Sequence, residues 1–243
     1  MKVYIKNINV WLQGLDNSLS LTSWANNELK LAEDFIIPKP QYYPKGQLRR
    51  LSPFSKIALH CLDIPAALSQ NLPLIFASQH GDLAKTITLI KDAALGEDLS
   101  PTKFALSVHN ATSGLFSIAT NNTAATTTIS AGANTFFEGL IEASMQCQQT
   151  NTQVIYSYCD LDVPEEYRQF EQEKPARCIT MILSSKRENH NLAAIDIALN
   201  NAKADSENTS PAELSFIRHF YSKNNQTIAS GNYLISLDFK SCS

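Results

Sequence analysis

Residues 126–143 read TTTISAGANTFFEGLIEA, in which a run of β-branched residues gives way to an apolar pattern of helical period. Thr126–Ser130 has the composition of a strand, because β-branched side chains favour extended backbone. Asn134–Gln149 has the pattern of a helix, with one apolar side formed by Phe137, Leu140, Ile141 and Met145. Between them lies Gly132, a residue that tolerates backbone conformations closed to others. We therefore predict a strand–turn–helix elbow over residues 130–134.

Outward from this elbow, strand patterns and helix patterns alternate along the chain. Strands are predicted at residues 2–12, 72–78, 154–159, 178–183 and 231–239. Helices are predicted to start after Ser52 and Ser100 and to cover residues 81–96, 110–118, 193–199 and 213–221. This alternation indicates an α/β layered fold. The length of 243 residues fits one hydrophobic core, so we predict one domain and assign the polar residues 200–211 to a loop inside it.

Composition excludes several classes of partner. The formal net charge of -3 gives no reason to expect nucleic acid or an anionic membrane as a ligand. Lys6 interrupts the only early apolar run, so no secretory signal is predicted. No uninterrupted apolar run reaches membrane-spanning length, so we expect no transmembrane segment and a cytoplasmic location. The five cysteines have irregular spacing, which favours free thiols over a disulfide framework.

Common signatures of cofactor and metal sites are absent from the sequence. It has no phosphate-binding glycine loop, no dinucleotide fingerprint, no serine-hydrolase motif and no HExxH zinc motif. No two histidines have the close spacing of metal ligands, so we predict neither a metal site nor a cofactor. His60 and Cys61 are adjacent, but neighbours on a helix point in different directions. Cys61 is therefore predicted to be a core residue instead of a nucleophile.

Several segments together resemble the N-terminal domain of β-ketoacyl synthases. They are FASQHGD at residues 76–82, LSPTKFALSVHNATSGLFSI at 99–118 and the elbow stretch itself. The segments LRRLSP at 48–53 and VIYSYCD at 154–160, the latter followed by Pro164, also fit. Within this family, the chain resembles the divergent branch found in bacterial aryl polyene gene clusters.

The resemblance implies a thiolase-like fold. A complete synthase of this family has two similar halves, each a mixed sheet flanked by helices. The first half supplies a nucleophilic cysteine at the elbow and the second supplies two histidines. Dimers form through the edge strand that follows the elbow. These properties set the expectations for fold and partner.

Two departures from the family pattern predict that catalysis is lost. Gly132 occupies the position of the cysteine, and glycine has no side chain to carry an acyl group. Residues 186–243 are too few for a second half, so we predict that 1–243 is about one half of the fold, with 186–243 a reduced remnant or cap. His190 and His219 lie in that segment, but outside any glycine-rich motif, and are predicted to be a loop residue and a helix-surface residue.

The resemblance then implies a chain-length-factor-like subunit of an aryl polyene pathway. Such a subunit forms a heterodimer with a full-length β-ketoacyl-ACP synthase, stabilises it, shapes its acyl tunnel and meets the acyl carrier protein indirectly. The candidate gates of the tunnel are Phe116, Phe136 and Phe137, each with core packing as the alternative role. The candidate interface residues are His109, Asn110 and Thr135, with a buried hydrogen bond as the alternative role of His109.

Two other functions stay open at this point. The chain could be an acyl transferase or decarboxylase that uses Cys147 or Cys159 instead of the missing cysteine. Cys147 is predicted to lie about 22 Å along the helix axis from the elbow, at about 1.5 Å per residue. The chain could also be a binding module without a synthase partner, although half of a thiolase-like fold would then expose an apolar face.

Overall fold

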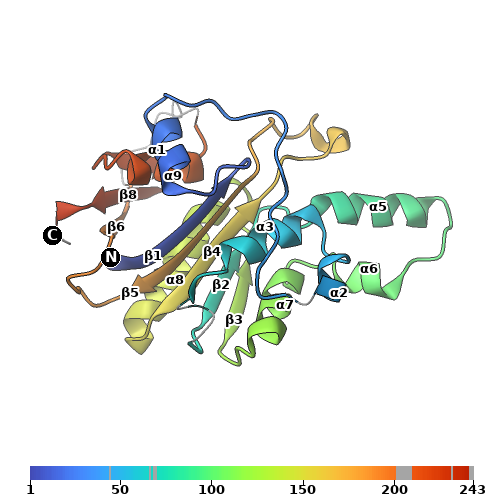
Figure 1. Ribbon diagram of the computed structural model, residues 1–243, viewed down its shortest axis with the longest axis horizontal. Coiled ribbons are helices and arrows are strands. Elements are labelled where there is room, and N and C mark those ends of the chain that lie inside the picture. Colours follow the sequence, from blue (N-terminus) through green and yellow to red (C-terminus); the bar gives the residue numbers. More distant parts are fainter. Residues whose placement is uncertain (44, 66, 68–69, 201–209, 231, 241–243) are drawn as a thin grey trace.

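The computed structural model describes residues 1–43, 45–65, 67, 70–200, 210–230 and 232–240. Its centre is an eight-stranded mixed sheet of order β3-β2-β4-β5-β1-β6-β8-β7 (Figure 1). β2 is parallel to β3 and β4, and the other neighbouring pairs are antiparallel. The strands are β1 (Lys2–Leu12), β2 (Leu74–Ala77), β3 (Thr126–Ile129), β4 (Val154–Asp160), β5 (Arg177–Ser184), β6 (Ala193–Leu199), β7 (Thr227–Ser230) and β8 (Tyr233–Asp238).

Helices cover both faces of this sheet. They are α1 (Ser18–Ala25), α2 (Lys45–Leu48), α3 (Pro53–Cys61), α5 (Leu83–Ala94), α6 (Pro101–Ala105), α7 (Ala111–Thr120), α8 (Thr135–Thr150) and α9 (Ala212–Tyr221), with 3-10 turns η1 (Gly132–Asn134) and η2 (Glu165–Tyr167). The predicted starts of α3 and α6 are confirmed, since Ser52 and Ser100 accept hydrogen bonds from the backbone N–H groups of Ser55 and Lys103.

Two hydrophobic cores lie on opposite faces of the sheet. One core joins α1, α8 and α9 to the sheet, and the other joins α3 and α7 to it. Figure 1 shows α3 and α8 on opposite sides of the strands. The molecule is therefore a three-layer α/β structure, which confirms the predicted fold class.

An irregularity in β1 keeps its apolar side chains in register with these cores. The pairing of β1 with β5 shifts between Ile5 and Asn7. Val3 and Ile5, at odd positions before the shift, lie in the core that contains α8. Val10, at an even position after the shift, lies in the same core. The one-residue offset reverses which face of the sheet the odd and even positions point to. Trp11 therefore lies in the other core, the one that contains α3.

The prediction of a helix at residues 193–199 is wrong. This segment is β6, paired antiparallel with β1 on one side and β8 on the other. Its sequence AAIDIAL is a short apolar run that fits either a buried helix turn or a strand. The backbone groups along β1 favour the strand, because pairing with β6 gives them hydrogen-bond partners inside the sheet. The sequence also gave no indication of α1 or β7.

Residues after 186 extend the same sheet and the same core. β6, β8 and β7 continue the strand order beyond β1, and α9 packs against α1, α8 and β7. Most of the predicted loop 200–211, the first residue of the predicted strand 231–239 and Cys242 lie outside the described residues.

The edge strand differs from the one that the family resemblance implied. β4 follows the elbow and α8, yet it lies inside the sheet between β2 and β5. The strand at that end of the sheet is β3, which precedes the elbow. Within the described ranges, no helix has both the length and the apolar character needed to cross a bilayer.

Candidate functional site

The elbow between β3 and α8 is a tight turn with Gly132 at its tip. Gly132 has φ of +58°, in the left-handed region that favours glycine. The Thr135 hydroxyl closes the turn, since its oxygen accepts from the Ala131 N–H at 2.9 Å and it donates to the Gly132 carbonyl at 2.7 Å. A β-carbon placed on Gly132 would meet no atom within 4 Å. The predicted strand–turn–helix is confirmed, and its tip has space for a side chain that the sequence does not supply.

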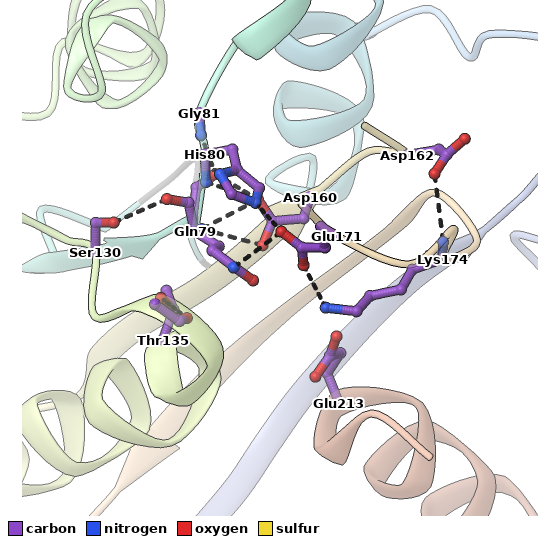
Figure 2. Close-up of polar contacts among 12 residues, drawn as sticks. Gln79, His80, Gly81, Ser130, Thr135, Asp160, Asp162, Glu171, Lys174 and Glu213 are labelled. Atoms are coloured by element: carbon purple, nitrogen blue, oxygen red, sulfur yellow. Dashed lines mark hydrogen bonds and ion pairs between the residues drawn. The ribbon is translucent and has the colours of Figure 1, made fainter. Parts of the chain in front are cut away.

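The turn that follows β2 lies beside the elbow and is fixed by a buried carboxylate (Figure 2). Asp160, at the end of β4, accepts hydrogen bonds from the Ser78 hydroxyl at 2.8 Å and the Gln79 N–H at 3.1 Å. The Ser130 hydroxyl of the elbow donates to the Gln79 carbonyl at 2.9 Å. The carboxyl ends of β2, β3 and β4 are thus tied together by polar side chains.

Residues 161–176, which connect β4 to β5, form a segment that we name the strap. Glu171 of the strap pairs with the His80 ring, accepts from the Gln79 amide at 3.2 Å and pairs with Lys174 at 2.5 Å. Burial raises the pKa of Glu171, but the hydrogen bonds from Lys174 and His80 outweigh burial and hold this pKa below its ordinary value. Figure 2 shows Glu171 directed at His80 across the end of the sheet.

A second polar cluster lies deeper and joins α9 to the sheet. The buried Arg177 guanidinium donates from Nε to Glu213 at 2.6 Å and from Nη2 to the Tyr158 hydroxyl at 3.2 Å. Burial raises the pKa of the Tyr158 hydroxyl, and the nearby Asp160 and Glu213 carboxylates add to that effect. Each member of this cluster has a partner, so a charge pair is tolerated in the core.

Cys147 and Cys159, the two candidate replacements for the missing nucleophile, are not placed to act at the elbow. Cys147 and Cys159 are fully buried, and burial raises the pKa of both thiols. Cys61 is also buried, with its sulfur 3.8 Å from the Cys178 carbonyl oxygen, which confirms its predicted core position. The adjacent His60 ring faces Asp16 at 3.8 Å. Cys61, Cys147 and Cys159 therefore serve as packing groups in the core.

The three candidate gate residues are buried within this chain. Phe136 packs against Tyr158 and Phe216 with ring centroids 5.5 and 5.4 Å apart, and Phe137 stacks on Tyr233. Phe116 lies in the core on the opposite face of the sheet, so the structure does not bring it together with the other two. Their role as gates stays a prediction, and each has a packing role here.

The three candidate interface residues occupy different environments. The His109 ring is half-buried over Gly81 and makes a 3.2 Å hydrogen bond with the Ser78 carbonyl. Asn110 is exposed just before α7, and Thr135 is buried inside the elbow. His190 lies in an exposed turn, whereas His219 is half-buried near the end of α9.

The sequence analysis did not single out Asp160, Glu171 or Lys174. Asp160 carried a usable signal, because it ends a continuous apolar strand. Glu171 and Lys174 lie in a polar connection with no motif. Across the residues that the structure describes, no group of three or more His, Cys, Asp or Glu side chains is arranged to hold a metal ion.

This sheet order with an elbow at the carboxyl ends of parallel strands defines one half of a thiolase-like fold. The family model described as β-ketoacyl synthase, N-terminal domain, matches residues 22–234. The chain therefore belongs to the β-ketoacyl synthase N-terminal-domain family. A search of curated proteins finds no match.

Solved structures with a similar fold include ketosynthases and ketosynthase complexes. The complex of the ketosynthase ApeO with its chain length factor ApeC from Xenorhabdus doucetiae matches with a TM-score of 0.80 and 21% identity, over 98% of this chain and 99% of that chain. The ishigamide ketosynthase/chain length factor matches with a TM-score of 0.64 and 11% identity, over 85% and 69%. AntDE:AntF, a type II PKS acyl-carrier protein in complex with its ketosynthase, matches with a TM-score of 0.63 and 10% identity, over 98% and 99%.

Proposed function

We propose that this chain is a non-catalytic, chain-length-factor-like partner of a β-ketoacyl-ACP synthase in aryl polyene biosynthesis. The observation that carries the proposal is Gly132 at the tip of the elbow, where the family has its nucleophile. The similarity to the Xenorhabdus doucetiae complex over nearly the whole length of both chains supports the same role.

The chemistry around the elbow supports a non-catalytic role. Acyl transfer needs a nucleophile and a base free to act on it. Here the Ser130 and Thr135 hydroxyls bond to backbone carbonyls, and the His80 ring pairs with Glu171. The thiols of Cys147 and Cys159 are buried with raised pKa values, so no observation favours the alternative of an acyl transferase or decarboxylase.

The free edge of β3 is the proposed docking strand for the synthase. The Ala125 carbonyl accepts a hydrogen bond from the Leu74 N–H at the start of β2. The Ile129 carbonyl accepts one from the Ser78 N–H just after β2. Because backbone groups alternate in direction along a strand, the N–H and C=O groups of Thr126 and Thr128 point away from β2. An unpaired edge of this kind is a template for a strand from another chain.

Exposed apolar side chains near this edge support the same interface. Leu95, Phe104 and Ile118 are 78%, 60% and 74% exposed, on or just after α5, α6 and α7. Figure 1 shows these helices at the β3 end of the sheet. An interface at this end of the sheet would cover these exposed side chains.

The predicted site residues and the segment after residue 185 take a defined place in this proposal. Phe136 and Phe137 would hold the elbow in position and so affect the partner's acyl tunnel indirectly. His109 and Asn110 would lie at the rim of the interface. Residues 186–243 would be either a reduced remnant of the second half or a cap on the sheet. The 99% coverage of the matched Xenorhabdus doucetiae chain supports this reading of the segment.

Copurification tests the proposal. The tagged chain is coexpressed with the β-ketoacyl synthase encoded nearest to it, and we expect the two to elute as one complex. Thr128→Pro removes an outward N–H from β3 without removing a bond to β2, so it should abolish the complex. Thr128→Val keeps that N–H and should preserve it.

A synthase that does not copurify and elongates normally alone would overturn the proposal. Equal retention of the synthase by both variants would support the partnership but exclude β3 as the docking strand.

A further inference from the structure

Three cavities meet at the strap, residues 161–176. On one side is a groove of about 620 Å³, whose opposite wall is the extended segment 31–37. On the other side are cavities of about 40 and 10 Å³ beside the turn after β2. Leu161 and Asp162 line all three. The strap is therefore the partition between the groove and the polar side chains next to the elbow.

The strap is attached to the body by charged contacts and little apolar burial. Within it, only Val163 and Ala176 are buried. Glu171 pairs with His80 after β2, and Glu166 pairs with Lys91 on α5. Segments with few buried apolar contacts open at a lower free-energy cost than the core does.

Both ends of the strap are fixed, as a hinge requires. At the start, the buried Asp160 is held by Ser78 and the Gln79 backbone. At the end, the Ala176 carbonyl accepts from the Gln13 N–H at 2.8 Å, and Arg177 is buried against Glu213. Motion is thus confined to the residues between two rigid points.

The strap is also braced within itself. Arg168 pairs with Asp162 at 3.2 Å, and Asp162 accepts from the Lys174 N–H at 3.3 Å. The rings of Tyr167 and Phe170 meet edge to face with centroids 5.9 Å apart. Contacts inside the segment hold its shape while contacts to the body are lost, so the strap can move as one piece.

We propose that the strap is a hinged lid, latched by the Glu171–His80 and Glu166–Lys91 pairs, which joins the groove to the elbow-side cavities when it opens. Figure 2 shows the Glu171 end of this latch. The inference does not depend on the proposed function, because it rests on contacts within this chain alone.

Hydrogen exchange of the whole chain, read by mass spectrometry, tests the lid. Glu171→Ala removes the contacts with His80, Gln79 and Lys174, and amides over the whole of residues 161–176 should exchange roughly tenfold faster. Lys91→Ala breaks the other pair and should accelerate the same span by a smaller factor. The matched control is Glu173→Ala, whose carboxylate meets only Arg168 within the strap, at 3.8 Å, and it should leave exchange unchanged.

Trypsin gives a second readout, because cleavage after Arg168 requires local opening. Glu171→Ala should be cut there roughly tenfold faster than the parent chain, and Glu173→Ala at the parent rate. The lid is overturned if each variant accelerates exchange only at the residues next to its own substitution. It is also overturned if the Glu173 control behaves like the Glu171 variant, or if Glu171→Ala changes neither readout.

Discussion

At Gly139, α8 packs closely against β2 and β4 of the sheet. A β-carbon at this position would lie 2.7 Å from the Ala77 β-carbon and 2.8 Å from Cε2 of Tyr156. Tyr156 cannot move away easily, because its hydroxyl donates to the Phe136 carbonyl at 2.6 Å. The glycine is therefore required by packing, not by backbone conformation.

Gly139→Ala should lower the free energy of unfolding by about 2 kcal/mol, the usual cost of overpacking a dense core. Gly114 on α7 is the matched control, since a β-carbon there meets nothing within 4 Å. Gly114→Ala should stabilise the chain by about 0.5 to 1 kcal/mol through helix propensity. Urea unfolding of both variants measures the change in the free energy of unfolding relative to the parent chain. An unchanged free energy of unfolding for Gly139→Ala would contradict the close packing.

Gly132 differs from Gly139 in what restricts it. The backbone conformation of Gly132 disfavours other residues, but a side chain there would have room. Gly132→Cys should fold with a loss of about 1 to 2 kcal/mol, the cost of a side chain in the left-handed region. The new thiol at the exposed tip should react with iodoacetamide within minutes, while Cys147 and Cys159 stay unlabelled in the folded chain. Mass spectrometry of digested peptides measures both, and rapid labelling of either native cysteine would contradict its burial.

At the scale of elements, a buried ion pair joins α9 to β5 in addition to the apolar packing of α9. Arg177 and Glu213 are both nearly inaccessible to solvent and lie on β5 and α9, so each would be costly to bury alone.

Glu213→Ala should cost about 3 to 5 kcal/mol, because it leaves the guanidinium buried without its partner. The double variant Arg177→Met with Glu213→Leu should recover most of that loss, since an apolar pair of similar volume needs no compensation. Thermal and urea unfolding of the single and double variants measure this coupling. A double variant less stable than Glu213→Ala would show that the pair is stabilising in its own right.

Elements with local signals were predictable and the others were not. Ser52 and Ser100 predict their helices because each capping hydroxyl and the N–H that donates to it are three residues apart. The segment 193–199 carried no local distinction between helix and strand, and only β1 and β8 on either side make it β6. Phe136 and Phe137 were candidate gates by position, but their burial against Phe216 and Tyr233 depends on elements far along the chain.

At the scale of the whole molecule, the elbow and the α/β class could be predicted, whereas the strand order and the polar site could not. The elbow is contiguous in sequence, so a single stretch contains it. The Glu171–His80 pair joins residues 91 positions apart, and Arg177 and Glu213 are 36 apart. No periodicity links such residues, so their meeting follows only from the completed sheet.

The central place of β1 has a consequence for how the protein is made. β1 is synthesised well before β5 and β6, yet it pairs with both, and the Met1 nitrogen donates to the Ile197 carbonyl at 2.7 Å. During synthesis, this apolar strand has no sheet partner until residues 177–199 have emerged. A contact of such long sequence separation slows folding and prolongs the exposure of an aggregation-prone segment. The nascent chain must therefore keep β1 from associating with other chains until β5 and β6 have been synthesised.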